Sequence, residues 1–366
     1  MNNLTVNIIK GGSKASSILD LLRFISAFIV FLFHFYVPLP GYQAVMVFFV
    51  LSGYFISATI LKSLKENRWS WSEYFLKRVI RLWIVLLPCL ISTFLLANLQ
   101  MMLFGSDQKI GNFLDVKSFL GNLFFLQGIL VGNYGLNGPL WSLSYEFWYY
   151  ILFPCLVFTV VSKKLSIKVL FALVFILISL FVGQRIMMYF LIWMTGALIP
   201  LVKPLKLKNN LVTYIILILA TIMAFFSTQY ESGDWVASWS NFAPDFRVGV
   251  AFSILIYLIV SFYNDKPSIY KINIPKHLSG FSYTLYLAHY PLANLILTWL
   301  VSPLWPFSKT TLTIKMVFAG FVLLYSWFLA LITERHTNKV RKFIFNIVFR
   351  NRSKVKETIF AKSNVL

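Results

Sequence analysis

Long apolar stretches recur along almost the whole chain and constrain its fold more than any other feature. A helix that crosses the hydrocarbon core of a bilayer needs about 20 mostly apolar residues. Ten stretches fit that requirement, and they cover residues 18–37, 42–63, 79–103, 139–161, 167–183, 186–202, 211–228, 246–263, 281–301 and 312–333. The sequence therefore predicts an all-α integral membrane protein with about ten transmembrane helices.

The composition supports the same class. Hydrophobic residues make up 59% of the 366 residues and charged residues 12%, and the mean hydropathy is +0.76. One globular core cannot bury so large an apolar share, so lipid must solvate part of it. The 33 Lys and Arg against 12 Asp and Glu would suggest a nucleic-acid partner in a soluble protein. Here the basic residues fall between apolar stretches, so we expect a lipid bilayer and no nucleic acid.

Lysine and arginine mark alternate gaps between the apolar stretches. The marked gaps hold Lys62, Lys65, Arg68, Lys77, Arg78, Arg81, Lys163, Lys164, Lys168, Lys203, Lys206, Lys208, Lys266, Lys271 and Lys276. With ten spans, all of these gaps share one side with Lys10, Lys14 and the basic segment after Thr333. The positive-inside rule makes that side the cytoplasm, so both termini are predicted to be cytoplasmic.

The chain is expected to have three parts: a cytoplasmic segment over residues 1–17, a transmembrane domain over 18–334 and a basic cytoplasmic tail over 335–366. The tail is basic enough to lie on anionic lipid headgroups. Two external loops, over about 104–138 and 229–245, are longer than simple turns. We expect them to shape an external binding site.

Ionisable side chains inside membrane helices are costly, so each is a candidate functional residue. The first predicted helix carries Asp20, Arg23 and His34. Arg23 and His34 lie on nearly the same helix face, about 16 Å apart along the axis. Two structural interpretations remain open: Arg23 could be a snorkelling side chain paired with Asp20, and His34 could be an interfacial histidine.

Two further segments, one before the third span and one inside the second, are informative. Arg78 and Arg81 are one helical turn apart before the third span, a spacing suited to gripping phosphate oxygens, although such residues commonly just flank a membrane helix. Ser52-Gly53 interrupts a bulky span and indicates a close helix contact or a cavity wall.

Polar residues also occupy the fourth and ninth spans. Glu146 lies about two turns into the fourth helix from the external side, where a carboxylate could orient His34 or simply stabilise the helix N-terminus. In the ninth helix Tyr286 and His289 are close to one turn apart, and Pro291 is expected to loosen the helix. A satisfied interior histidine is an equally good interpretation of His289.

These segments together resemble a known family. They are Leu19-Asp20-Leu21-Leu22-Arg23 followed by His34, Phe48-Phe49-Val50-Leu51-Ser52-Gly53-Tyr54, Phe75-Leu76-Lys77-Arg78-Val79-Ile80-Arg81-Leu82, Trp141-Ser142-Leu143-Ser144-Tyr145-Glu146 and Tyr283-Thr284-Leu285-Tyr286-Leu287-Ala288-His289. In this order they are similar to acyltransferase family three, whose multispanning membrane enzymes O-acetylate bacterial surface polysaccharides and other glycosylated molecules.

The resemblance implies a location in the bacterial cytoplasmic (inner) membrane and a set of site roles. Arg23 and His34 would form the family's Arg-ten-His signature, and Arg78 and Arg81 its Arg-x-x-Arg signature. The acyl donor would be cytoplasmic acetyl-CoA, used as a co-substrate, and the acceptor a polysaccharide or glycolipid outside. No permanently bound cofactor and no metal is expected.

The chemistry fits these positions. Arg23, Arg78 and Arg81 are predicted to hold the donor, and a neutral histidine at position 34 could take the proton of the acceptor hydroxyl near pH 7. A transient acyl-histidine remains an alternative route. Candidate supporting residues are Asp20, Ser142, Tyr286 and His289. The oxyanion could be stabilised by Ser142, by Tyr286 or by a backbone amide.

A different class of function remains open. A transporter or flippase of a glycan or lipid-linked precursor would also span the membrane many times, and such proteins often contain inverted repeats with broken helices. No internal repeat is visible in the sequence, which favours the enzyme.

Overall fold

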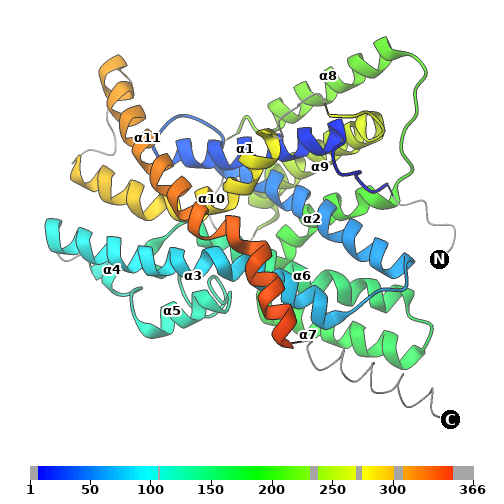
Figure 1. The fold of residues 1–366 in the computed structure, drawn as a ribbon, viewed down its shortest axis with the longest axis horizontal. Coiled ribbons are helices and arrows are strands. Elements are labelled where there is room, and N and C mark those ends of the chain that lie inside the picture. The colour runs from blue at the N-terminus through cyan, green and yellow to red at the C-terminus, as the bar shows by residue number, and fades with distance from the viewer. Residues whose placement is uncertain (1–6, 106–107, 231–237, 269–273, 301–307, 349–366) are drawn as a thin grey trace.

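The computed structural model describes residues 7–105, 108–230, 238–268, 274–300 and 308–348, and the named elements in these ranges are all helices. The long helices are α1 (Lys14–Phe33), α2 (Gly41–Lys65), α3 (Trp71–Phe104), α6 (Leu140–Val161), α7 (Leu165–Leu198), α8 (Asn210–Ser227), α9 (Trp239–Tyr263), α10 (Ile274–Trp299) and α11 (Lys309–Ile332). Two short helices, α4 (Gln108–Gly111) and α5 (Val116–Leu123), lie between α3 and α6. Figure 1 shows α1 near the centre, where it packs against α2 and α10.

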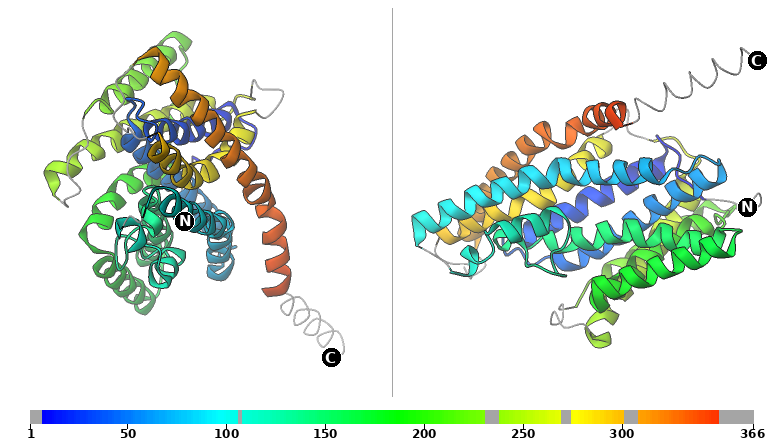
Figure 2. Two further views of the ribbon diagram at one scale, coloured as in Figure 1. Left: turned by 90° about the vertical axis from the view of Figure 1, so that its left-hand side faces the viewer. Right: turned by 90° about the horizontal axis from the view of Figure 1, so that it is seen from below.

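The predicted all-α membrane fold is confirmed. Eight helices among the described residues are long and apolar enough to cross a membrane, with α7 counted once. The predicted ninth span corresponds to α10, which is long enough to cross but is not among these eight. The helices lie side by side in a layered bundle (Figure 2). The count of ten spans and the orientation stay predictions.

The α7 element contains the chain reversal expected around Gly183–Arg185. Gly183 has φ +82°, a left-handed conformation that glycine adopts without strain. Before it, Phe171 and Phe181 contact Phe158 and Trp148 of α6 respectively, so this half runs antiparallel to α6. After it, the successive contacts of Tyr189 with Tyr145 and of Trp193 with Phe153 run parallel to α6. The chain therefore turns back on itself at Gly183.

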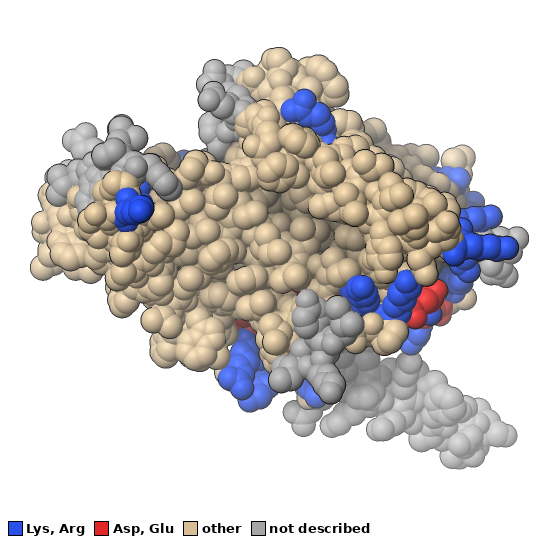
Figure 3. Space-filling model, turned by 90° about the horizontal axis from the view of Figure 1, so that it is seen from above, with Lys and Arg blue, Asp and Glu red and all other residues tan. Residues whose placement is uncertain are grey.

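The outward faces of the helices are apolar, as a lipid-facing surface requires. Large hydrophobic side chains that are more than half exposed include Leu95, Leu170, Leu180, Leu219, Phe226 and Phe328. In Figure 3 a wide face of the molecule shows almost no charged side chains, and the largest group of lysines and arginines lies at one end. We call this the basic end.

A close crossing of α2 and α7 fixes the centre of the bundle. A Cβ atom added to Gly53 would lie 2.1 Å from the Trp193 carbonyl oxygen, and one added to Gly196 would lie 2.0 Å from the Val50 carbonyl oxygen. Both obstacles are backbone atoms, so the helices could not keep this distance with larger residues. The close helix contact predicted at Ser52-Gly53 is confirmed.

Replacement of Gly53 by alanine should therefore destabilise the protein. The helices would have to separate at the crossing, at a cost of about 1–3 kcal/mol for an overpacked site. The measurement is the free energy of unfolding in mixed detergent micelles. Gly320→Ala in α11 is the control, because a Cβ there meets nothing within 4 Å. Equal stability of both variants would contradict the crossing.

Candidate active site

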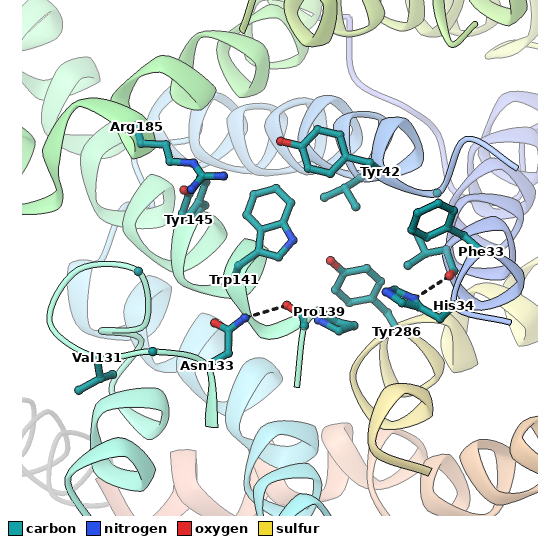
Figure 4. Close-up of a pocket in the computed structure, with 16 residues that line it drawn as sticks. Phe33, His34, Tyr42, Val131, Asn133, Pro139, Trp141, Tyr145, Arg185 and Tyr286 are labelled. Atoms are coloured by element: carbon teal, nitrogen blue, oxygen red, sulfur yellow. Dashed lines mark hydrogen bonds between the residues drawn. The ribbon is translucent and has the colours of Figure 1, made fainter. Parts of the chain in front are cut away.

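A cavity of about 420 Å³ lies between α1, α2, α6, α7, α10 and the loop that precedes α6. We call it the outer cavity. The side chains that matter for its chemistry are His34, Tyr42, Trp141, Tyr145, Arg185 and Tyr286. Figure 4 shows Arg185 and His34 on opposite sides, with Trp141 and Tyr42 between them. Aromatic walls with a few convergent polar groups are typical of a small-molecule or sugar-binding site.

The loop that lines the outer cavity belongs to the predicted external loop over about 104–138. Gly128, Val131, Asn133 and Gly138 all contribute to the wall. The α5 helix and the turn after it fold back against the bundle, where the ring of Phe125 stacks on Phe147 with centroids 4.2 Å apart. In the second predicted loop, residues 231–237 lie outside the described part of the chain.

A much narrower space of about 60 Å³, here called the middle passage, lies beside the outer cavity. Its polar lining includes Arg23, Ser52, Arg81, Glu146 and Tyr150. Beyond it an inner cavity of about 950 Å³ lies at the basic end of the molecule. Seven basic and two acidic residues line this inner cavity, namely Arg23, Lys77, Arg78, Arg81, Lys276, Arg341 and Lys342 together with Glu73 and Glu334.

The three spaces share wall residues in succession. Val45 and Tyr286 line both the outer cavity and the middle passage. Arg23, Arg81 and Tyr283 line both the middle passage and the inner cavity. A row of polar side chains therefore connects a strongly basic chamber with the cavity that holds His34.

His34 is paired with a second histidine. The Nε2 atom of His289 lies 3.0 Å from Nδ1 of His34, and Nδ1 of His289 lies 2.7 Å from the Leu285 carbonyl oxygen. Because a carbonyl only accepts, Nδ1 of neutral His289 carries the hydrogen and its Nε2 is an acceptor. His34 Nδ1 also lies 2.9 Å from the Val30 carbonyl oxygen, so it carries a hydrogen shared between two acceptors.

This arrangement sets the chemical state of His34. With the hydrogen on Nδ1, the Nε2 atom of neutral His34 is left as a proton acceptor. None of the described hydrogen bonds uses that atom, and His34 lines the outer cavity. His289 has no exposed surface and lies behind His34. His289 can therefore position His34 but cannot touch a ligand in the cavity.

Pro291 contributes to the same region. It has no N–H to donate to the Leu287 carbonyl one turn earlier, which leaves that oxygen available. The carbonyl instead accepts from Cys89 Sγ at 3.0 Å and from Asn137 Nδ2 at 3.1 Å. The carbonyl oxygen left free by Pro291 thus links α10 by hydrogen bonds to α3 and to the segment before α6. Cys89 and Cys155 are both free and buried.

The predicted contact between Glu146 and His34 is not present among the described residues. Glu146 Oε1 accepts a hydrogen bond from Ser52 Oγ at 2.9 Å and another from the Tyr150 hydroxyl. The reason is depth: α1 ends at Phe33, so His34 lies at the end of its helix, whereas Glu146 lies about 9 Å into α6. Glu146 consequently faces the middle passage on the side of the arginines.

The predicted arginines do come together, and none of them forms a salt bridge with another described residue. Arg23 and Arg81 share walls, and Arg78 lines the inner cavity with them. The three salt bridges among the described residues, Lys10–Asp265, Arg68–Glu66 and Lys77–Glu73, include none of these arginines. The suggested Arg23–Asp20 pair is therefore not formed, and the Arg23 guanidinium lies over the Phe55 ring at 4.9 Å. Cations that outnumber the nearby carboxylates and form no salt bridge with them favour an anionic ligand.

Ser142 and Tyr286, both predicted as supporting residues, contact each other. Their hydroxyl oxygens are 2.7 Å apart in the wall between the outer cavity and the middle passage. Their position near the end of the passage makes them available to a ligand that reaches through it. Asp20 makes no hydrogen bond or ion pair with another described residue and lines none of the three spaces.

A buried carboxylate that the sequence did not single out supports the outer cavity. Asp245 is 2% exposed and accepts hydrogen bonds from Tyr189 at 2.5 Å and from Tyr230. Tyr189 in turn lies 2.5 Å from the hydroxyl of Tyr42, whose ring lies stacked near Trp141 with centroids 5.8 Å apart. The chain of contacts fixes the aromatic wall opposite His34. Acidic character alone could not reveal it, because its partners come from α2, α7 and the segment after α8.

Comparison with known proteins decides the family. A family model described as an acyltransferase domain matches residues 17–335 of the chain. The chain belongs to acyltransferase family three. The matched range includes His34, Glu146 and the three arginines, so the family assignment and the sequence of cavities concern the same part of the molecule. This membrane acyltransferase has its polar residues concentrated along one path.

Two relatives give the level of similarity. The acyltransferase is 29% identical over 183 residues to an O-acetyl transferase of Shigella phage Sf6, covering 45% of this chain and 52% of that protein. It is 25% identical over 138 residues to an uncharacterized protein of Haemophilus influenzae, covering 36% of this chain and 55% of that protein. The matches span about half the length of these curated relatives. No solved structure matches the chain.

Proposed function

We propose that this membrane acyltransferase moves an acetyl group from cytoplasmic acetyl-CoA to a hydroxyl group of an extracytoplasmic glycan, such as O-antigen, capsule or exopolysaccharide. The observation that carries the proposal is the succession of shared walls from the basic inner cavity to the cavity of His34. The phage relative, named an O-acetyl transferase, supports the choice of reaction.

The donor would enter from the basic end. The phosphate groups of CoA carry several negative charges, and the guanidiniums of Arg23, Arg78 and Arg81, which form none of the described salt bridges, offer planar donors for phosphate oxygens. The pantetheine arm would extend through the middle passage, the narrowest of the three spaces, which would have to widen around it. The thioester would then lie near Tyr286, the residue shared between passage and outer cavity.

The acceptor sugar would lie against the aromatic wall of the outer cavity. Its hydroxyl oxygen attacks the thioester carbonyl carbon while His34 Nε2 takes the hydroxyl proton. The Ser142–Tyr286 hydroxyl pair is placed to donate to the developing oxyanion. When the tetrahedral intermediate collapses, the C–S bond breaks and the departing thiolate receives the proton from His34, giving an acetyl ester and free CoA.

Glu146 has a different role in this account from the one its sequence position suggested. It lies in the middle passage with Arg23 and Arg81, held by Ser52 and Tyr150. We assign it to the donor path, where a single carboxylate among arginines limits their mutual repulsion and orients them.

The test is an assay with acetyl-CoA labelled in its acetyl group. Membranes containing the protein are incubated with this donor and with bacterial surface polysaccharides from which mild base has removed the O-acetyl groups. We expect alkali-labile label on polysaccharide and an equal amount of free CoA. Intact acetyl-CoA, together with movement of unmodified glycan across the membrane, would instead identify a transporter.

His289 should act as a positioning residue for His34. Its replacement by leucine removes one of the two acceptors of the His34 Nδ1 hydrogen, so kcat should fall about 10–100-fold, as for other groups that orient a histidine. The KM for acetyl-CoA should not change, because the donor arginines lie in other cavities. His289→Gln keeps an acceptor on a side chain of similar reach and should recover much of kcat. Equal loss in both variants, or a changed KM, would indicate a merely structural role.

A further inference from the structure

The helical segment after α11 forms one wall of the inner cavity. Helical structure continues through residues 337–348, in the part of the chain predicted to be a tail lying on lipid headgroups. Asn338, Arg341, Lys342 and Phe345 line the inner cavity together with the arginines of α1 and α3. The Lys77 ammonium of α3 lies 5.5 Å from the centre of the Phe345 ring, which ties the segment to α3.

The segment has two distinct faces. The cavity residues recur at intervals of three and four, so they share one side of the helix. Phe343 and Ile347 are 66% and 61% exposed and lie on the other side, where they can contact lipid. Arg341 and Lys342 therefore face the cavity, whereas the lipid-facing surface is apolar.

The charge of the inner cavity also exceeds what its carboxylates can balance. Seven basic residues line it against Glu73 and Glu334, and Glu73 is already bonded to Lys77 at 3.1 Å. A ligand with several negative charges would balance this excess. The 3′-phosphate and pyrophosphate of CoA together carry about three to four negative charges.

We propose that the segment over residues 337–348 is part of the donor site, with Arg341 and Lys342 binding phosphate groups of CoA. This assignment rests on the proposed use of acetyl-CoA. It extends the donor site beyond α1 and α3 to a segment at the end of the described chain. Phosphate groups of lipids share the same chemistry, so the experiment must separate the two sources.

The experiment measures the dissociation constant of CoA by calorimetry, with the full-length protein in nanodiscs of pure phosphatidylcholine. The double variant Arg341→Gln/Lys342→Gln should weaken CoA binding about tenfold or more, because charge-assisted hydrogen bonds to phosphate are lost. Competition by pantetheine, which has no phosphate, should be the same in the variant and the wild type. Lys339→Gln on the exposed face is the matched control and should bind CoA normally.

Each other outcome overturns a specific statement. If the wild type binds CoA and the double variant binds it equally well, the segment is not part of the donor site. If the double variant differs only in nanodiscs that contain anionic lipid, Arg341 and Lys342 bind lipid headgroups. If the wild type binds no CoA, the proposed function itself fails. Equal loss of CoA and pantetheine binding would indicate a general disruption of the cavity.

Discussion

Replacement of His34 by glutamine should lower kcat for acetyl transfer by about 10²–10⁴-fold, the usual contribution of a general base. Glutamine has similar size and can keep a hydrogen-bond donor near His289, but it cannot take a proton near pH 7. The KM for acetyl-CoA should stay close to the wild-type value, because His34 lines the outer cavity and not the basic inner one. The measurement is labelled acetyl transfer to base-treated polysaccharide.

The same substitution at an unrelated histidine provides the control. His277 is exposed and lines none of the three spaces, so His277→Gln should leave kcat unchanged. A His34→Gln protein with wild-type kcat would exclude His34 as the base. An acyl-histidine route would also lose activity in this variant, and it would be recognised by acetyl label retained on wild-type protein in the absence of acceptor.

Replacement of Arg81 by glutamine should act mainly on the donor. Arg81 borders both the inner cavity and the middle passage, so its loss removes a cation at the point where the nucleotide and the pantetheine arm would meet. A charge-assisted hydrogen bond contributes about 1.5–3 kcal/mol, so the KM for acetyl-CoA should rise about 10–100-fold. Arg81→Lys should recover only part of this, because lysine cannot bind phosphate in a bidentate way.

A matched control lies at the same end of the molecule. Arg68 is exposed and paired with Glu66, and it lines none of the three spaces. Arg68→Gln should leave the KM unchanged. If Arg81→Gln and Arg68→Gln had the same small effect, the basic residues would act only through general charge at the membrane surface.

The membrane fold was predictable because it depends on the length and apolarity of single segments. Each predicted span corresponds to a helix or to one half of α7, and the reversal at Gly183 was visible as an interruption of an apolar run. The clustering of Arg23 with Arg81 was predictable only through the family motif. Periodicity places residues on a helix face, but it does not state which helix that face meets.

The pairing of His34 with His289 could not be predicted from the sequence, because periodicity does not show which helices contact each other. The two residues are 255 positions apart and meet because α1 packs against α10. The depth of Glu146 was predicted correctly, but that of His34 was misjudged, because the first helix was expected to run to residue 37 and α1 ends at Phe33. The tail was predicted to lie on headgroups because only its charge was visible, whereas its cavity-facing side depends on packing near α3.

The most direct test of the central claim is the sidedness of the reaction in sealed right-side-out membrane vesicles. Labelled acetyl-CoA is enclosed in the vesicles or added outside, and base-treated polysaccharide is always supplied outside. We predict acetyl ester on the external polysaccharide only when the donor is inside, and loss of that signal in His34→Gln. Equal labelling when donor and acceptor are both outside would contradict transfer from the basic end to the outer cavity.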